Sequence, residues 1–214
     1  MTTRAPLTRD KVVASALALV ERHGVESLSM RKLAAELGVE AMSLYNHVKN
    51  KDDVLDAITV VVFERVKPPA PTADWRADAH ALADAFRAAA LTFPRTASLS
   101  LTRQLRSESA IPLTEVALDV LRRAGFDASD SVHALRALLA YVVGTLLREV
   151  GSSPAFAGLD PLAQANRESA LIATGLPRVT ESAKALSACH HEDEYRFGLN
   201  LLIEALAARA TITR

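Results

Sequence analysis

The stretch LSMRKLAAELGVEAMSLYNHVKNK, residues 28–51, predicts two short helices joined by a tight turn. Ser29 is a good N-cap for the first helix, because its hydroxyl can accept a hydrogen bond from a free backbone N–H. Apolar residues then recur at the spacing of a buried helical stripe as far as Leu37. Gly38 can adopt the left-handed conformation that ends a helix. A second helix of about two turns is expected to begin near Glu40.

The predicted second helix has two different faces. Leu44 and Val48 are four residues apart, so one side of the helix is buried. The other side carries hydrogen-bonding and methyl-bearing groups that contribute little to a core, namely Ala41, Met42, Ser43, Tyr45, Asn46 and His47. Helix, glycine-containing turn and helix together form the helix-turn-helix, whose second helix lies in the major groove of DNA.

The longer run GVESLSMRKLAAELGVEAMSLYNHVKNKDDVL, residues 24–55, closely resembles the DNA-binding domain of the tetracycline-repressor (TetR) family of regulators. This resemblance implies that Ser29 and Arg31, at the start of the first motif helix, contact phosphate or a base edge. The base-reading residues of the second helix would be Ala41, Met42, Ser43 and Asn46. The residues that hold the DNA backbone would be Tyr45, His47 and Lys51.

Composition favours an all-α protein. The chain has 214 residues, of which 50% are hydrophobic, 5% are aromatic and only eight are glycine, as in proteins built of packed helices. Its net charge is zero, but residues 1–51 hold eight Arg and Lys against five Asp and Glu, a surplus of +3 that the remaining residues balance. The positive charge therefore lies with the motif, as expected of a nucleic-acid interface.

The location of the protein is expected to be cytoplasmic. Cys189 is the one cysteine and cannot form an internal disulfide, and the opening residues MTTRAPLTRDK do not resemble a signal segment. The most apolar stretch, residues 137–147, is 11 residues long and too short to span a bilayer.

Two domains are expected. Thr8 caps a helix over residues 9–23, and Asn50 caps a helix that runs to Lys67. Three prolines within residues 68–71 then end that helix and stiffen the joint. The boundaries that follow are 1–67 for a DNA-binding domain with a connecting helix and 68–214 for a helical ligand-binding and dimerisation domain. Helices of the second domain are expected over residues 74–92, 95–106, 112–124, 129–150, 160–174 and 192–210, with a short turn near 177–188.

The run ALDVLRRAGFDASDSVHALRALLAYVVGTLLREVG, residues 117–151, also resembles the tetracycline repressors, in the part that forms their effector-domain core and much of their dimer interface. The pattern of residues 129–150 is apolar nearly all round, which predicts burial on several sides. The last helix, 192–210, carries an apolar stripe that either packs on its own domain or joins 129–150 of two subunits in a four-helix bundle.

Members of the family couple a small-molecule pocket to the release of DNA, and tetracycline repressors hold a magnesium-chelated drug there. In register with that family, Leu82 and Ala117 stand where the tetracycline repressors have the asparagine and the glutamine that hold the drug. Residues 98–106, where their metal-binding histidine would lie, contain no histidine. We therefore expect a hydrophobic effector other than magnesium-tetracycline.

The pocket is expected to be mostly apolar, with a few polar groups for orientation, although apolar helical stripes also form solid cores. The expected effector-binding residues are Leu82, Phe86, Leu101, Arg103, Gln104, Leu113, Ala117, Val132, Leu135 and Leu139. Further polar candidates are His80, His133 and Tyr141.

Residues that could form a metal site or an enzyme active site also occur in the sequence. The run from Cys189 to Glu194 has histidines and carboxylates, but adjacent histidines do not share a helix face and the spacing matches no zinc pattern. There is no G-x-S-x-G motif and no glycine-rich phosphate loop, so no enzyme activity, cofactor or metal is expected. A DNA-binding protein without an effector, or a helical enzyme, remain as alternatives.

The sequence thus predicts a homodimeric, ligand-responsive regulator that represses transcription from a near-palindromic operator. Two-fold symmetry requires half-sites about 34 Å apart, or a multiple of that distance.

Overall fold

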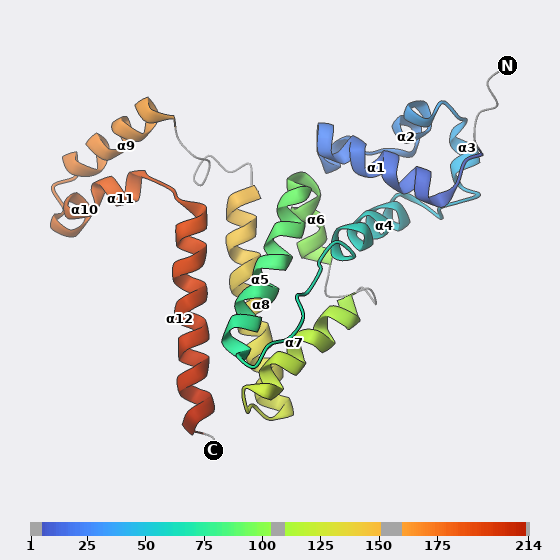
Figure 1. The fold of residues 1–214 in the computed structure, drawn as a ribbon. Helices are drawn as coiled ribbons and strands as arrows, with labels where there is room; N and C mark the ends of the chain where they lie inside the picture. The colour runs from blue at the N-terminus through green and yellow to red at the C-terminus, as the bar shows by residue number, and fades with distance from the viewer. Residues whose placement is uncertain (1–5, 104–109, 151–159, 213–214) are drawn as a thin grey trace.

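Helices make up all the regular structure that the described residues contain. The computed structural model describes residues 6–103, 110–150 and 160–212, and within these ranges it has no strand. The expected all-α class is confirmed. Figure 1 shows a small group of N-terminal helices beside a group of longer ones, with the long C-terminal helix α12 along the opposite side.

The N-terminal unit consists of helices α1–α4 and one short 3₁₀ turn. Thr8 caps the first helix through a hydrogen bond from the backbone N–H of Lys11, and Ser29 caps α2 through one from Lys32. Val12, Leu33, Leu44 and similar side chains form its buried core. The elements are α1 (Arg9–His23), η1 (Val25–Ser27), α2 (Met30–Leu37), α3 (Ala41–Leu44) and α4 (Lys51–Phe63).

Helix α4 contributes to two hydrophobic cores, one in each unit. Its first half, with Val54 and Ile58, packs in the N-terminal core, whereas Phe63 packs with the helices that follow. The helix ends at Phe63 and not at Lys67 as predicted, because the next residues form tighter turns before the prolines, with i to i+3 hydrogen bonds.

The C-terminal unit consists of helices α5–α12. Asp74 and Asp160 cap α5 and α9, and proline occupies the first turn of α7, α9 and α10. The region near 177–188, expected to be a turn, forms two short helices. The elements are α5 (Trp75–Thr92), α6 (Pro94–Arg103), α7 (Ile111–Arg123), α8 (Ala128–Val150), α9 (Pro161–Ala173), α10 (Pro177–Glu181), α11 (Ala183–Ser187) and α12 (His191–Ile212).

Helix α8 is the central helix of this unit. It packs against α5, α6, α7 and α12. The expected burial on several sides agrees with these contacts, although one face of α8, which includes Leu147, is exposed in the single chain. Among the described residues, α8 is the one helix whose length and apolar composition would allow it to cross a membrane, a test that core helices also pass. At 23 residues, α8 is longer than the apolar stretch 137–147 within it, which is too short by itself to span a bilayer.

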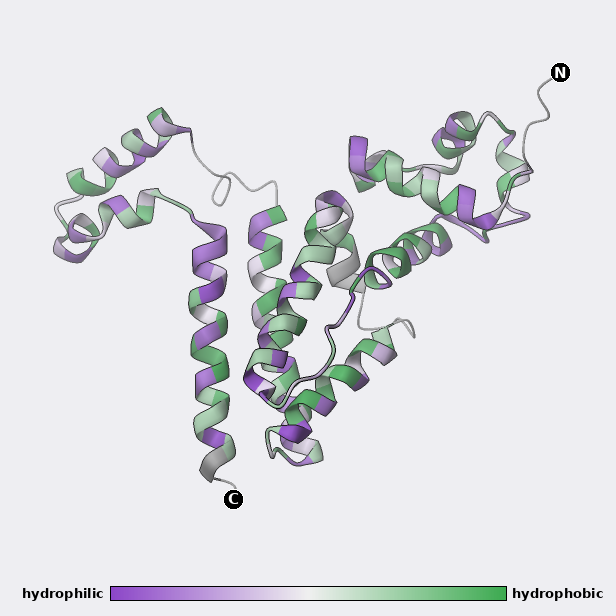
Figure 2. Ribbon diagram, in the orientation of Figure 1, coloured by the Kyte–Doolittle hydropathy of each residue, from purple (hydrophilic) through white to green (hydrophobic). Residues whose placement is uncertain are grey.

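Polar contacts join α12 to the rest of the unit. The hydroxyl of Tyr141 on α8 donates to the backbone oxygens of Glu194 and Tyr195, at 2.8 and 3.0 Å. A Cβ atom at Gly198 would lie 2.2 Å from that hydroxyl, so the close approach of the two helices requires glycine. The hydroxyl of the buried Tyr195 donates to Asp84 of α5, at 3.0 Å. Apolar residues nevertheless recur along the length of α12 (Figure 2).

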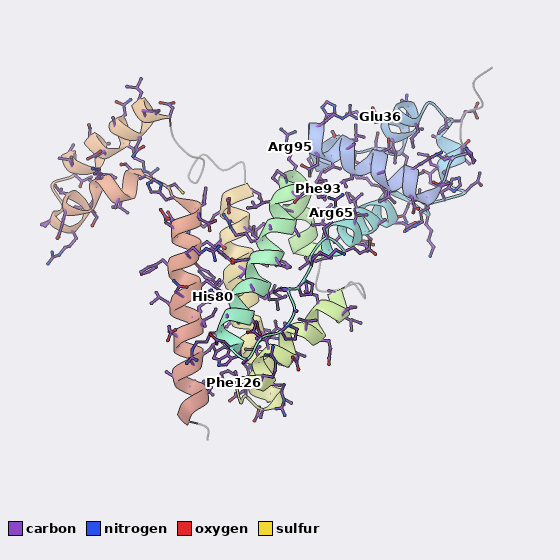
Figure 3. The ribbon with its side chains drawn as sticks, in the orientation of Figure 1. Glu36, Arg65, His80, Phe93, Arg95 and Phe126 are labelled. Carbon is purple, nitrogen blue, oxygen red and sulfur yellow. The ribbon has the colours of Figure 1, made fainter. Side chains whose placement is uncertain are left out.

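The two units meet where α1 and α4 contact α5 and α6. The Glu21 carboxylate of α1 accepts hydrogen bonds from the backbone N–H and the hydroxyl of Thr96, at 2.7 and 2.6 Å, and so caps α6 from another helix. Nearby, the Arg65 guanidinium lies 4.7 Å from the centre of the Phe93 ring. Figure 3 shows Arg65, Phe93 and Arg95 together at this junction.

Candidate functional site

The turn between α2 and α3 has the geometry that Gly38 predicts. Gly38 adopts φ 61° and ψ 42°, the left-handed region, and ends α2. The backbone N–H of Val39 reaches back to the oxygen of Ala34, at 3.0 Å, which satisfies a carbonyl at the helix end. The turn therefore sets α3 at a fixed angle to α2.

The predicted second motif helix is shorter than expected. Only Ala41–Leu44 is α-helical, and a hydrogen bond from His47 N–H to Leu44 oxygen, at 2.9 Å, continues it as a tighter turn. Leu44 and Val48 are buried, as the four-residue spacing predicts, while the Met42 side chain is 73% exposed. The expectation of two helical turns is thus wrong, although the two faces are as expected.

All nine expected DNA-binding residues are at least partly accessible. Arg31, Met42, Tyr45 and Asn46 are exposed, and the other five are intermediate. They come from the start of α2, from α3 with its following turn, and from the first residue of α4. The fold therefore leaves all nine side chains accessible on the helix-turn-helix and the start of α4.

Arg9 holds the end of the motif in place. Its guanidinium donates to the backbone oxygen of His47, at 2.9 Å, and to both carboxylate oxygens of Asp53, at 2.7 and 3.1 Å. Asp53 also accepts from the backbone N–H of Lys49, at 2.8 Å. The Arg9 hydrogen bond, followed by the one from Lys49, lowers the pKa of Asp53 to about 2. Sequence reasoning missed this clamp, because no local pattern links residues 44 positions apart.

A cavity of about 110 Å³ lies between α5, α7 and α8. Its lining is almost entirely apolar, and the hydroxyl of Thr114 already donates to the backbone oxygen of Ala110, at 2.8 Å. The residues that line it are Ala79, Leu82, Ala83, Phe86, Ala110, Leu113, Thr114, Ala117, Val120, Leu121, Leu135, Leu138, Leu139 and Val142. Such a cavity favours apolar groups.

Six of the ten expected effector-binding residues line this cavity, namely Leu82, Phe86, Leu113, Ala117, Leu135 and Leu139. Val132 does not, because the cavity wall on α8 begins one turn later at Leu135. Gln104 lies outside the described residues, as do the side chains of Leu101 and Arg103.

The further polar candidates do not line the cavity either. Tyr141 is directed to the carbonyls of α12, and the His133 side chain is exposed. His80 is partly buried on α5 (Figure 3) and is not among the lining residues. Leu138 and Val142, which the sequence argument missed, continue the stripe of Leu135 and Leu139 at helical spacing, so extending that stripe would have found them.

The histidine-containing segment at the start of α12 does not assemble a metal site. The Cys189 sulfur lies 3.6 Å from both ring nitrogens of His191. Within the part of the chain that the structure describes, no group of three or more His, Cys, Asp or Glu side chains gathers in a metal-binding arrangement.

An accessible helix-turn-helix, joined through one shared helix to a helical unit with an apolar cavity, defines the class of one-component regulators. Residues 12–58 match the family model described as bacterial regulatory proteins of the tetR family, and residues 67–210 match the tetracyclin repressor-like C-terminal domain. The chain therefore belongs to the TetR family of transcriptional regulators.

Individual relatives agree with this assignment. An HTH-type transcriptional regulator of Saccharopolyspora erythraea is 40% identical over 148 residues, which cover 69% of this chain and 63% of that protein. The structure of Streptomyces coelicolor ActR in complex with actinorhodin has a TM-score of 0.84 and 26% identity, and covers 96% of this chain and 99% of that one. BioQ with its double-stranded DNA operator has a TM-score of 0.70 and 26% identity, over 95% and 99% of the two chains.

Proposed function

We propose that this regulator is a homodimeric repressor that leaves its operator when a hydrophobic small molecule enters the cavity between α5, α7 and α8. The observation that carries the proposal is the apolar cavity in a chain that also presents an accessible helix-turn-helix. Residues 1–67 act as the DNA-binding domain and residues 68–214 as the effector and dimerisation domain. The protein works in the cytoplasm, and it is not an enzyme.

The DNA contacts follow from the position of each group on the motif. Arg31 and Lys51 are accessible cations, which neutralise phosphates. Ser43 and Asn46 carry hydroxyl and amide groups that can donate to and accept from base edges in the major groove. Tyr45 and His47 hold the DNA backbone, Ser29 contacts phosphate or a base edge, and the methyl-bearing Ala41 and Met42 contact bases. The structure of BioQ with its double-stranded DNA operator supports operator binding by this chain.

The chemistry of the lining defines the effector class. Leu82 and Ala117 occupy the positions where a magnesium-tetracycline site needs amide groups, and both line the cavity. Burial of apolar surface at about 25 cal/mol per Å² is then the main source of affinity. A planar or acyl hydrophobic molecule suits such walls, and the related ActR has been solved in complex with actinorhodin.

The size of the cavity links binding to release. At about 110 Å³ it is smaller than the pockets of roughly 300–1,000 Å³ that hold drug-sized ligands, so an effector must displace lining side chains as it enters. An effector shifts the equilibrium between the DNA-binding and the released conformation only as far as it binds the released one more tightly. To change the ratio of released to DNA-binding protein from 1:99 to 99:1, the effector must bind the released conformation ~5.5 kcal/mol more tightly.

The test is release of DNA by chosen compounds. A duplex that the full chain binds is first selected from a randomised pool, and its complex is then titrated with actinorhodin and, separately, with tetracycline plus magnesium. We expect actinorhodin to release the DNA and magnesium-tetracycline to leave it bound. Release by magnesium-tetracycline would contradict the assigned effector class, and failure to select any duplex would contradict the assigned DNA-binding role.

A further inference from the structure

A groove of about 310 Å³ lies between α5, α7 and the linker that follows α4. Figure 1 shows this linker running beside α7, where Arg123 donates to the backbone oxygen of Thr72 at 3.0 Å. The groove combines apolar walls with four charged side chains. The residues that line it are Pro68, Pro69, Pro71, Asp78, Leu82, Glu115, Val116, Asp119, Val120 and Arg123.

The groove adjoins the apolar cavity of about 110 Å³, because Leu82 and Val120 line both spaces. Val120 is buried and β-branched, so its side chain has little rotational freedom. Leu82 is only partly buried and has two rotatable side-chain bonds, so it can change its rotamer. Such a change joins the two spaces. The joined space reaches the range of roughly 300–1,000 Å³ that holds drug-sized ligands, which the cavity alone does not.

The charged groups of the groove carry a surplus of negative charge. Asp78, Glu115 and Asp119 are three carboxylates against one guanidinium, that of Arg123. The guanidinium already lies 2.8 Å from Asp78 and 3.0 Å from Asp119. Asp78 also accepts hydrogen bonds from the backbone N–H and the hydroxyl of Thr72, at 3.0 and 2.8 Å. Because Arg123 is used within the protein, the groove does not attract an anion.

Glu115 is the charge that a ligand can use. Its side chain is exposed and forms no hydrogen bond or ion pair with any other residue that the structure describes. It lies one turn before Asp119 on α7, and both line the groove. Two like charges at this spacing repel each other, and a cation beside them relieves that repulsion. The groove therefore favours a cationic group over a neutral or an anionic one.

We propose that the cavity and the groove form one amphipathic site and that its ligand is a hydrophobic amine, an inference that rests on the function proposed above. The apolar body of the amine occupies the cavity between α5, α7 and α8. Its ammonium group lies in the groove beside Glu115 and Asp119. Leu82 is the partition that the ligand displaces, and Glu115 determines the specificity for a cation.

Three compounds with the same eight-carbon chain test this assignment, because they differ in the charge at one end. Octylamine is a cation at pH 7, 1-octanol is neutral and octanoate is an anion. Isothermal titration calorimetry measures the Kd of each compound for the full-length protein without DNA. We expect octylamine to bind about tenfold more tightly than octanol, since it gains a charged hydrogen bond, and octanoate to bind most weakly.

Variants at each end of the site locate the two parts of the ligand. Glu115→Gln should remove the tenfold advantage of octylamine and leave the Kd of octanol unchanged. Ala117 lines the cavity but not the groove, so Ala117→Leu should weaken the binding of all three compounds by a similar factor. Glu64→Gln removes an exposed carboxylate outside the groove and should keep the advantage of octylamine. Thermal unfolding establishes that each variant folds, and Ala83→Val fills the cavity from α5 if Ala117→Leu does not fold.

Several results would overturn the amphipathic site. Equal Kd values of octylamine and octanol would do so, and so would an advantage of octylamine that persists in Glu115→Gln. If octylamine bound a folded Ala117→Leu variant with unchanged Kd, its chain would not occupy the cavity, and the joined site would be wrong.

The release of DNA separates this inference from the proposed function. The same three compounds are titrated into the complex of the protein with its selected duplex. Release by octanol and octylamine at equal concentrations would agree with the proposed function and overturn the preference for a cation. Binding in the expected order without release of DNA would support the site and contradict the proposed function. Failure of all three compounds to bind would contradict both.

Discussion

Single charged groups hold the helix-turn-helix in shape, and Asp53 is the clearest case. Its carboxylate joins Arg9 of α1 to the backbone N–H of Lys49, shortly after the turn that follows α3. These hydrogen bonds favour the charged form of Asp53, which explains why its pKa falls from 3.8 to about 2. A group whose pKa is lowered by folding stabilises the native state above its unfolded pKa, and that stabilisation is lost as pH falls through about 2.

Asp53→Asn should therefore lower stability at pH 7 by on the order of 1 kcal/mol, since Arg9 is partly exposed and solvent screens the pair. The difference from wild type should disappear as the pH approaches 2. Urea unfolding at several pH values measures both effects. Asp52→Asn removes a carboxylate from the same first turn of α4 and controls for the helix dipole. If Asp53→Asn lowered the free energy of unfolding by the same amount at every pH in this range, the charge of Asp53 would not be the source of the stabilisation.

At the scale of elements, the proposed function gives the motif contacts that position the protein and contacts that read sequence. Lys51 begins α4, and Asn46 lies in the exposed turn after α3. A phosphate contact contributes to the affinity for every DNA, whereas a base contact contributes only where its partner base is present.

Lys51→Ala should weaken binding to selected and random duplexes alike, and reduce the slope of log K against log salt by about one per subunit. Asn46→Ala is the matched comparison. It should change which DNA sequence is preferred, because each lost base contact removes ~1–3 kcal/mol of discrimination between bases. Binding titrations at several salt concentrations, with both duplexes, give these values. Unaltered affinity of Lys51→Ala for random DNA would remove Lys51 from the set of phosphate contacts.

At the scale of the whole molecule, the single chain leaves large apolar side chains uncovered. Phe197 is 69% exposed and Leu201 57% exposed, one turn apart on α12, and Leu147 of the adjacent α8 is also exposed. This observation favours the predicted four-helix bundle of α8 and α12 from two copies over the alternative in which α12 packs only on its own domain.

Phe197→Asp should convert the dimer to a monomer and lower operator affinity, since the charge would be buried without a partner at the interface. Analytical ultracentrifugation over a range of protein concentrations measures the change. Ile111→Asp introduces the same charge at a side chain of α7 that is 63% exposed and should remain dimeric. A dimeric Phe197→Asp protein would place the interface elsewhere.

Local chemistry explains which features could be predicted from the sequence. Thr8, Ser29, Asn50 and Asp74 cap helices at the predicted residues, because a cap is a hydrogen bond over two or three positions. Gly38 takes the left-handed conformation for the same local reason. The predicted length of α3 is wrong, because the backbone after Leu44 forms a tighter turn in which the N–H of His47 donates to the oxygen of Leu44.

The amino-acid sequence by itself determined the helices, their caps, the motif and the apolar stripes, since all of these depend on residues a few positions apart. Only the tertiary structure decided how far the cavity extends along α8, which excluded Val132, and which side chains meet across the fold. The Arg9 to Asp53 clamp and the contact of Phe63 with Phe86 join residues far apart in the chain. Such contacts depend on the packing of whole helices, which no local periodicity encodes.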